Sequence, residues 1–224
     1  MYASFPCALC GTDYSGLLCR GCHRDLPGLT LACTRCGLPS PSPVCAGCLV
    51  KPPLWQHLVA PFSFAYPMDK IIHEFKYSGA VFWGSFLAAA VVRQGLALNV
   101  PLPEALIPVP MHPRRLAERG FNQAMELARG IGRELDIPIL SGALARTECR
   151  LPQVGLSADK RRKNIRGAFS ATLDRFSQRS IAIVDDILTT GATANELARV
   201  LRRIGVAQIQ VWVVARTLSP RRWR

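Results

Sequence analysis

The sequence predicts an α/β domain with a parallel sheet flanked by helices, preceded by a small cysteine-rich module. Eight of the nine cysteines fall before residue 49. After residue 60, strand-like and helix-like segments alternate, which is typical of a parallel sheet with helical crossovers. A short, wholly apolar segment at residues 181–184 is followed by a helical pattern, as expected of a strand buried on both faces. We expect the module to span residues 1–52 and the α/β domain residues 60–224.

The cysteines form an internal repeat. The pattern C-x2-C-G-x7-C-x-G-C occurs twice, and every fixed position recurs 26 residues later. Two thiolates of a C-x2-C turn can reach one ion, and four complete a closed, tetrahedral zinc site. We therefore expect two structural Zn²⁺ sites, while a cross-braced pairing between the repeats stays open. The expected ligands are Cys7, Cys10, Cys19 and Cys22 for one ion, and Cys33, Cys36, Cys45 and Cys48 for the other.

A disulfide framework is the alternative for these cysteines. The first residues, Met1–Cys7, lack the basic start and apolar stretch of a secretory signal, so we expect a cytoplasmic protein with reduced thiols. The longest apolar run, Phe82–Val92, is too short to span a bilayer and predicts a buried helix without membrane insertion. Cys149 lies outside the cysteine repeat, and we expect it to be an incidental thiol rather than a nucleophile.

The chain is strongly basic, with a formal net charge of +13 and a pI near 9.9. This charge favours anionic partners: nucleic acid, a phosphorylated small molecule or an acidic membrane surface. Charge alone does not distinguish among them.

The elements of the α/β domain follow a short linker at residues 49–60. Pro67 marks a helix start, and Ile71, Ile72 and Phe75 recur at helical spacing after it. Residues 181–184 predict a buried parallel strand, and residues 194–204 its crossover helix. The other expected elements are strands at 62–66, 105–109 and 209–215 and helices at 82–95 and 122–135.

The segment Ile181–Thr193 carries the most informative chemistry. It combines a buried strand, the acidic pair Asp185 and Asp186, a Thr/Gly loop and a helix start. In open α/β sheets, ligands bind beyond the carboxyl ends of the strands. Gly191 lets the backbone close on a phosphate, and the amides, hydroxyls and helix N-terminus donate to it. Because ionised carboxylates are pure acceptors, the acidic pair suits the two hydroxyls of a ribose, and the segment predicts a ribose 5-phosphate site.

Other phosphate sites fit this segment less well. The Gly-Lys-Ser/Thr ending of nucleotide triphosphatase loops is absent, and no G-x-G-x-x-G follows a strand. In a phospho-accepting receiver domain the acidic pair follows the first strand, whereas here fewer than 40 residues follow Asp186. A strand and turn of ordinary composition is the remaining alternative.

The same segment resembles the motif of the type I phosphoribosyltransferases, which is four apolar residues, two acidic residues and a Thr-Thr-Gly-x-Thr loop. Residues 105–125, together with the cysteine module, more specifically resemble the ComF competence family. The resemblance covers essentially the whole chain. It implies a type I phosphoribosyltransferase-like sheet that binds 5-phosphoribosyl diphosphate, with Mg²⁺ bridging the diphosphate.

The resemblance also implies roles for individual residues. Asp185 and Asp186 would hold the ribose hydroxyls, and the loop after the strand at 105–109 would hold the diphosphate. Three arginines between a strand and a helix suit an anion on chemical grounds as well, although a solvated basic face is the alternative. The implied 5-phosphate ligands are Thr189, Thr190, Gly191, Ala192 and Thr193, and the diphosphate candidates are His112, Arg114, Arg115 and Arg119.

A long polar stretch at residues 146–169 resembles the flexible loop of the phosphoribosyltransferases, and long loops in compact domains are often lids. Our hypothesis is that Arg161 or Arg162 closes over the diphosphate and joins Asp185 and Asp186 in catalysis. The alternative is a helix N-terminus with solvated charges, or a nucleic-acid-binding patch.

The sequence is compatible with two functions. One is a phosphoribosyltransferase with an unknown acceptor, and the other is a non-catalytic ligand-sensing or DNA-binding scaffold that keeps the ribose-phosphate site. The resemblance implies a role in handling imported single-stranded DNA, in natural transformation or in DNA utilisation. A basic chain with zinc modules could grip DNA phosphates without sequence preference. The link to DNA could also run through a DNA-uptake helicase. The acceptor and the oligomeric state do not follow from the sequence.

Overall fold

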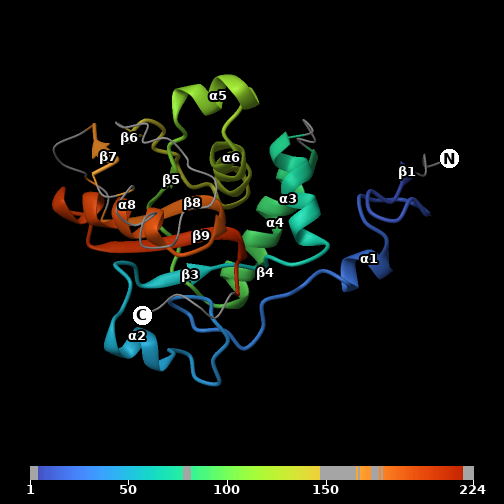
Figure 1. Ribbon diagram of the computed structural model, residues 1–224, viewed down its shortest axis with the longest axis horizontal. Coiled ribbons are helices and arrows are strands. Elements are labelled where there is room, and N and C mark those ends of the chain that lie inside the picture. The colour runs from blue at the N-terminus through green and yellow to red at the C-terminus, as the bar shows by residue number, and fades with distance from the viewer. Residues whose placement is uncertain are drawn as a thin grey trace.

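The computed structural model describes residues 5–77, 82–146, 165, 167–172, 177 and 179–218. A five-stranded sheet in which every strand pair is parallel lies at its centre (Figure 1). This arrangement confirms the predicted α/β architecture. The strand order is β3 (His57–Val59), β9 (Gln208–Arg216), β8 (Ser180–Leu188) and β5 (Ala105–Pro108), and β4 (Phe62–Ser63) also pairs with β9.

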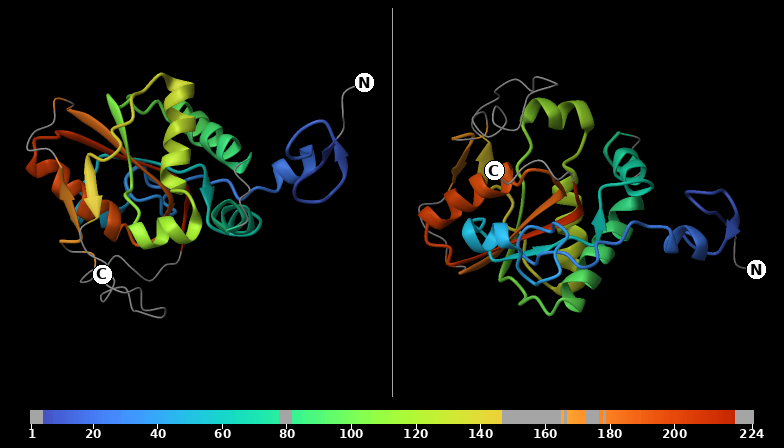
Figure 2. Two further views of the ribbon diagram at one scale, coloured as in Figure 1. Left: turned by 90° about the horizontal axis from the view of Figure 1, so that it is seen from above. Right: turned by 60° about the horizontal axis from the view of Figure 1, so that its bottom comes forward.

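Apolar side chains cover both faces of this sheet. Successive residues of β8 alternate between the faces, so that Ala182 and Val184 pack in one cluster and Ile181 and Ile183 in another. Helices complete both layers, which is the usual environment of a parallel sheet. One face is covered by α3 (Met68–Tyr77), α4 (Phe82–Ala97) and α6 (Gln123–Leu135), and the other by α8 (Ala192–Arg203) (Figures 1 and 2).

The helix positions follow local signals in the sequence. The apolar run at residues 82–92 lies within the largely buried helix α4, as predicted. Helix α6 begins after Asn122, whose Oδ1 accepts a hydrogen bond from the backbone N–H of Ala124 at 3.0 Å. It approaches α4 closely at Gly130, where an added Cβ would lie 2.5 Å from the Cβ of Ala88. The spacing of these two helices therefore requires glycine at this position.

Several elements differ from the sequence prediction. Strand β3 lies within the expected linker, and helix α5 (Pro113–Arg119) occupies residues that were expected to form a loop. Strand β9, expected as the last strand, lies inside the sheet between β8 and β3. A short antiparallel pair, β6 (Leu144–Arg146) and β7 (Phe169–Ala171), flanks the long polar stretch. Strands of three residues and a polar helix of seven are too short to show a hydrophobic period.

The two cysteine repeats fold as separate small units. The first contains β1 (Phe5–Pro6), β2 (Asp13–Tyr14) and α1 (Arg20–Arg24), and it projects to one side of the sheet (Figure 2). The second contains α2 (Ala46–Val50) and lies beside β3 (Figure 1). Whether residues 1–52 and 60–224 behave as independent domains stays a prediction.

The two units are attached to the sheet in different ways. In the second unit, the carbonyl oxygen of Arg35 accepts a hydrogen bond from Trp55 Nε1 at 2.7 Å, and that of Thr34 accepts one from Leu58 N at 2.8 Å. The first unit contacts α4, where the ring of His23 meets that of Phe86 edge-on at 6.3 Å between centroids. Among the helices that the structure describes, none has the length and apolarity needed to cross a bilayer.

Candidate functional site

The candidate site lies at the carboxyl ends of β5 and β8. These strands are parallel neighbours, with Pro108 paired to Val184, so the residues that follow them meet at one edge of the sheet. Strand β8 continues to Leu188, so Asp185 and Asp186 lie within the strand, not after it as we expected. The longer strand fixes the backbone of the acidic pair in extended geometry.

The two carboxyl groups are close together and largely buried. The backbone N–H of Asp186 donates to Asp185 Oδ1 at 2.9 Å, and Lys76 Nζ of α3 lies 2.6 Å from Asp186 Oδ2. Burial, followed by the negative charge of Asp186, raises the pKa of Asp185 to about 8. Lys76 opposes this shift. A carboxyl group with such a pKa can donate or accept a hydrogen bond near neutral pH.

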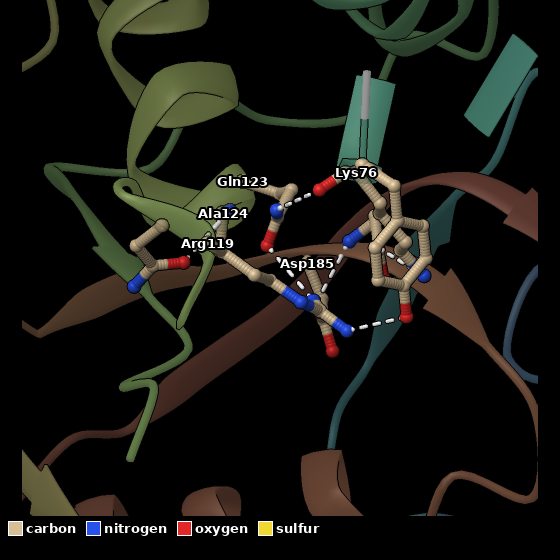
Figure 3. A network of polar contacts seen from close by, with 8 residues as sticks. Lys76, Arg119, Gln123, Ala124 and Asp185 are labelled. Atoms are coloured by element: carbon tan, nitrogen blue, oxygen red, sulfur yellow. Dashed lines mark hydrogen bonds and ion pairs between the residues drawn. The ribbon is translucent and has the colours of Figure 1, made fainter. Parts of the chain in front are cut away.

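Basic side chains of α5 face the acidic pair across a cavity of about 220 Å³. Arg119 is held at the end of α5 by its Nη2, which donates to Tyr77 Oη at 2.7 Å, and by stacking of its guanidinium 4.7 Å from the centre of the Tyr77 ring. Gln123 Oε1 accepts from Arg119 Nη1 at 3.3 Å. Figure 3 shows Lys76, Arg119 and Gln123 converging over Asp185 from three different helices.

Two of the four diphosphate candidates line this cavity together with the acidic pair. Arg115 and Arg119 do so, one helical turn apart on α5. His112 instead caps α5, because its Nδ1 accepts a hydrogen bond from the backbone N–H of Arg114 at 3.2 Å. Arg114 is exposed and does not line the cavity. Helix α5 thus separates the four residues that were expected on one loop.

The Thr/Gly loop closes the other side of the site. Gly191 has a φ of 72° and immediately precedes α8, so it occupies the left-handed region that favours glycine. Thr190 Oγ1 accepts a hydrogen bond from Ala192 N at 3.3 Å. A second hollow, of about 30 Å³, is lined by Thr189, Gly191, Ala192 and Thr193, and Thr193 also borders the larger cavity. The five predicted phosphate ligands therefore lie together at the N-terminus of a twelve-residue helix.

Several residues that line the cavity were not predicted as site residues, and three of them carry long polar side chains. Lys76 comes from α3, Gln123 from the first turn of α6, and Arg146 from the end of β6. Gln123 and Arg146 lie in segments that carry the family resemblance, but no role was expected for either, and the fold brings all three to the acidic pair. Arg161 and Arg162 lie outside the described residues, on the segment between β6 and β7, as does Cys149.

The eight cysteines of the repeats form two groups, each from one repeat. Within each group all four sulfurs lie within 4.8 Å of one another. The cross-braced alternative is therefore wrong. The first group is Cys7, Cys10, Cys19 and Cys22, and the second is Cys33, Cys36, Cys45 and Cys48.

These groups have the chemistry of a metal centre. In each group a backbone N–H donates a hydrogen bond to a cysteine sulfur. Cys19 N donates to Cys7 Sγ and Cys45 N donates to Cys33 Sγ, each at 3.3 Å. Burial, assisted by the neighbouring Cys33 thiolate, raises the pKa of Cys36 to about 12. Four clustered thiols therefore cannot all ionise unless a cation compensates their charge. The donor sets fit a thiophilic metal ion in closed, tetrahedral coordination.

Comparison with known sequences gives relatives along almost the whole chain. No protein-family model matches the sequence. The chain is 38% identical over 208 residues to competence protein F of Haemophilus influenzae, with 89% of this chain and 90% of the relative covered. It is 37% identical over 207 residues to the DNA utilization protein YhgH of Escherichia coli O157:H7, covering 90% and 91%. Competence protein ComFC of Bacillus subtilis is 26% identical, covering 85% and 80%.

Comparison with solved structures gives weaker similarities. Glutamine phosphoribosylpyrophosphate amidotransferase from B. subtilis has a TM-score of 0.35 and 19% identity, covering 58% of this chain and 24% of that one. Purine phosphoribosyltransferase from Pyrococcus horikoshii has a TM-score of 0.36 and 15% identity, covering 61% and 84%.

Proposed function

Since this chain belongs to the family of competence protein F and DNA utilization protein YhgH, we propose that it binds 5-phosphoribosyl diphosphate and acts in the handling of imported single-stranded DNA. Relatives in three organisms carry names for competence or DNA utilisation. The proposal for the small-molecule ligand is independent of those names. It comes from the chemistry of the site.

The ligand proposal rests on one observation: acidic and basic side chains line the same cavity. Asp185 and Asp186 of β8 and Arg115 and Arg119 of α5 line the same cavity. The Thr/Gly loop at the start of α8 borders the same space through Thr193. Acceptors for ribose hydroxyls, donors for a 5-phosphate and cations for a diphosphate are the three groups that 5-phosphoribosyl diphosphate requires.

We assign one role to each part of the site. Asp185 and Asp186 hold the ribose hydroxyls, and residues 189–193 hold the 5-phosphate. Arg115 and Arg119 attract the diphosphate, for which a bound Mg²⁺ would supply further positive charge. Lys76 neutralises Asp186 in the free protein and is released towards the diphosphate when ribose occupies the acidic pair. Arg161 or Arg162 would close over the diphosphate.

The two candidate functions of this site differ in whether the bond between the anomeric carbon and the diphosphate is broken. In a phosphoribosyltransferase, departure of the diphosphate creates positive charge at the anomeric carbon, and catalysis depends on positioning and electrostatic stabilisation. In the alternative, the chain is a non-catalytic sensor or DNA-binding scaffold that keeps the site. Diphosphate release in the presence of candidate nitrogen acceptors distinguishes the two.

We propose that both cysteine groups bind structural Zn²⁺ and that the protein acts in the cytoplasm, where thiols remain reduced. The positive charge of the chain suits contact with the phosphates of single-stranded DNA. A DNA-uptake helicase is the protein partner that we propose.

Calorimetric titration of 5-phosphoribosyl diphosphate with Mg²⁺ into the zinc-loaded protein tests the ligand proposal. We expect micromolar affinity in the wild type and at least about a tenfold loss in D185N/D186N, because an amide NH2 group, which only donates, replaces one oxygen of each carboxyl group at the ribose hydroxyls. The matched control is E134Q, which removes an exposed carboxylate near the far end of α6. Equal binding by all three proteins, or no binding by the wild type, would overturn the proposal.

A further inference from the structure

Arg216 connects the second cysteine unit to the phosphate loop. It is the last residue of β9 and is only 2% exposed. Its Nε donates to the carbonyl oxygen of Cys36 at 2.6 Å, and its Nη1 donates to that of Leu188 at 2.9 Å. Nη1 also donates to the carbonyl oxygen of Thr189, the first residue of the loop. One planar guanidinium thus bridges a cysteine ligand of one site and the backbone of the other.

The buried positive charge of Arg216 lies directly beside the same cysteine unit. No ion pair between described residues includes Arg216, so its buried positive charge is compensated by carbonyl oxygens and by nearby sulfur. Four thiolates around one Zn²⁺ carry a net negative charge, which makes the loaded site a counter-ion for the guanidinium.

The packing around Gly37 makes this connection rigid. Gly37 follows Cys36 with a φ of 68°, and a Cβ added to it would lie 2.7 Å from Leu58 Cδ2 and 3.1 Å from Arg216 Cγ. The equivalent residue of the first repeat, Gly11, has a φ of 76° and no neighbour within 4 Å of such a Cβ. The repeat therefore provides two glycines with the same backbone conformation, of which one contacts Arg216.

We propose that Arg216 is a positioning residue that couples metal occupancy of the second cysteine site to phosphate binding at the loop Thr189–Gly191. When the site is loaded, the carbonyl of Cys36 is fixed, Arg216 is held, and the loop keeps the conformation that receives the 5-phosphate. When the metal leaves, Arg216 loses its counter-ion and its fixed acceptor, and the loop loses its anchor. This inference rests on the proposed function, because it assumes that the loop binds phosphate.

Thermodynamic linkage gives the test, because coupling between two ligands is reciprocal. We would follow zinc transfer to a chromogenic chelator with and without 5-phosphoribosyl diphosphate and Mg²⁺. The full chain would carry C10S and C22S, so that only the second site is loaded. At equilibrium, we expect the ligand to raise the affinity of the second site for zinc about tenfold, within the usual range of coupling energies. In the same background, R216K should abolish the ligand dependence, because one ammonium cannot span the carbonyls of Cys36 and Leu188 together.

The two glycines supply the matched control for folding effects. In the otherwise unmodified chain, G37A should weaken binding of 5-phosphoribosyl diphosphate about tenfold, whereas G11A should leave it within about twofold. Ligand that binds normally without raising the zinc affinity would overturn the coupling and leave the proposed function intact. Ligand that fails to bind the zinc-loaded wild type would overturn both. A ligand dependence that persists in R216K would assign the coupling to another residue and refute the role of Arg216.

Discussion

Asp185 is the residue whose ionisation should affect stability most clearly. Its folded pKa of about 8 lies above the ordinary value, so the folded state binds a proton more tightly than the unfolded state. The contribution of this group is therefore present below about pH 4 and is lost as pH rises through about 8. We expect its contribution to the free energy of unfolding to fall by at most about 1.4 kcal/mol per pH unit in that window.

Urea unfolding of wild type and D185N between pH 5 and pH 8.5 checks this expectation. An amide does not ionise, yet it can keep the acceptor for the backbone N–H of Asp186. The variant should show a flatter pH dependence than the wild type, and E134Q should keep the wild-type slope. Parallel curves for D185N and wild type would contradict the raised pKa.

Lys76 should matter more for stability than a similar lysine on the same helix. Its ion pair with Asp186 is mostly buried, with side-chain exposures of 19% and 13%, whereas Lys70 is 51% exposed in its pair with Glu74. Replacing Lys76 with Met leaves a largely buried carboxylate without its partner, so we expect a loss of roughly 1 to 3 kcal/mol, as for other buried polar groups that lose a partner. The same change at Lys70 should cost no more than about 1 kcal/mol, as for other surface pairs.

Chemical denaturation at pH 7 measures both effects. Equal losses in K76M and K70M would show that the pair with Asp186 contributes no more than a solvated one.

Site residues that lie within one sequence motif could be predicted, whereas residues that connect distant parts of the chain could not. Asp185, Asp186 and residues 189–193 lie in one continuous segment, so their proximity follows from a single strand and loop. Lys76 and Arg216 are common basic residues whose partners lie far away in the sequence, and only tertiary packing reveals them. The contribution of Arg161 and Arg162 stays a prediction.

Helices α4 and α6 illustrate how one small residue controls the packing of two elements. Because a Cβ on Gly130 would overlap Ala88, we expect G130A to force the helices apart and to cost roughly 1 to 3 kcal/mol, as overpacking usually does. G95A is the control, since its Cβ would meet Trp212 and Val59 at ordinary contact distances of 3.7 to 3.8 Å. Thermal unfolding compares the two variants. A G130A protein as stable as the wild type would mean that the helices adjust without cost.

Long, largely apolar or amphipathic elements were predicted well, and short polar ones were missed. The strands β8 and β9 and the helix α4 contain continuous apolar runs, whose lengths separate strand from helix, and α6 has its apolar residues at helical spacing. Helix α5 has no apolar face and is stabilised by a proline start, the cap from His112 and a left-handed Gly120 at its end. The proline and the glycine were visible in the sequence, but the resemblance to the phosphoribosyltransferases predicted a diphosphate loop at this position.

For the whole molecule, the two cysteine units should contribute unequally to stability. The second unit hydrogen-bonds β3 and Arg216, whereas the first contacts α4 from one side. We therefore expect C33S/C36S to lower the melting temperature of the sheet domain more than C7S/C10S, which occupies equivalent positions of the first repeat. Differential scanning calorimetry of the zinc-loaded variants measures this difference. Equal reductions would mean that the contacts of the second unit add nothing to the sheet.

The position of β9 has a consequence for synthesis on the ribosome. Because β9 pairs with β8 on one side and with β3 and β4 on the other, the strands made earlier cannot form one sheet until residues 208–216 have left the exit tunnel. A nascent chain that ends before this point leaves β8 unpaired on one edge and exposed to chaperones and proteases. Premature termination should therefore give degradation instead of a partly active fragment, since Arg216 and the phosphate loop are organised only in chains translated through β9.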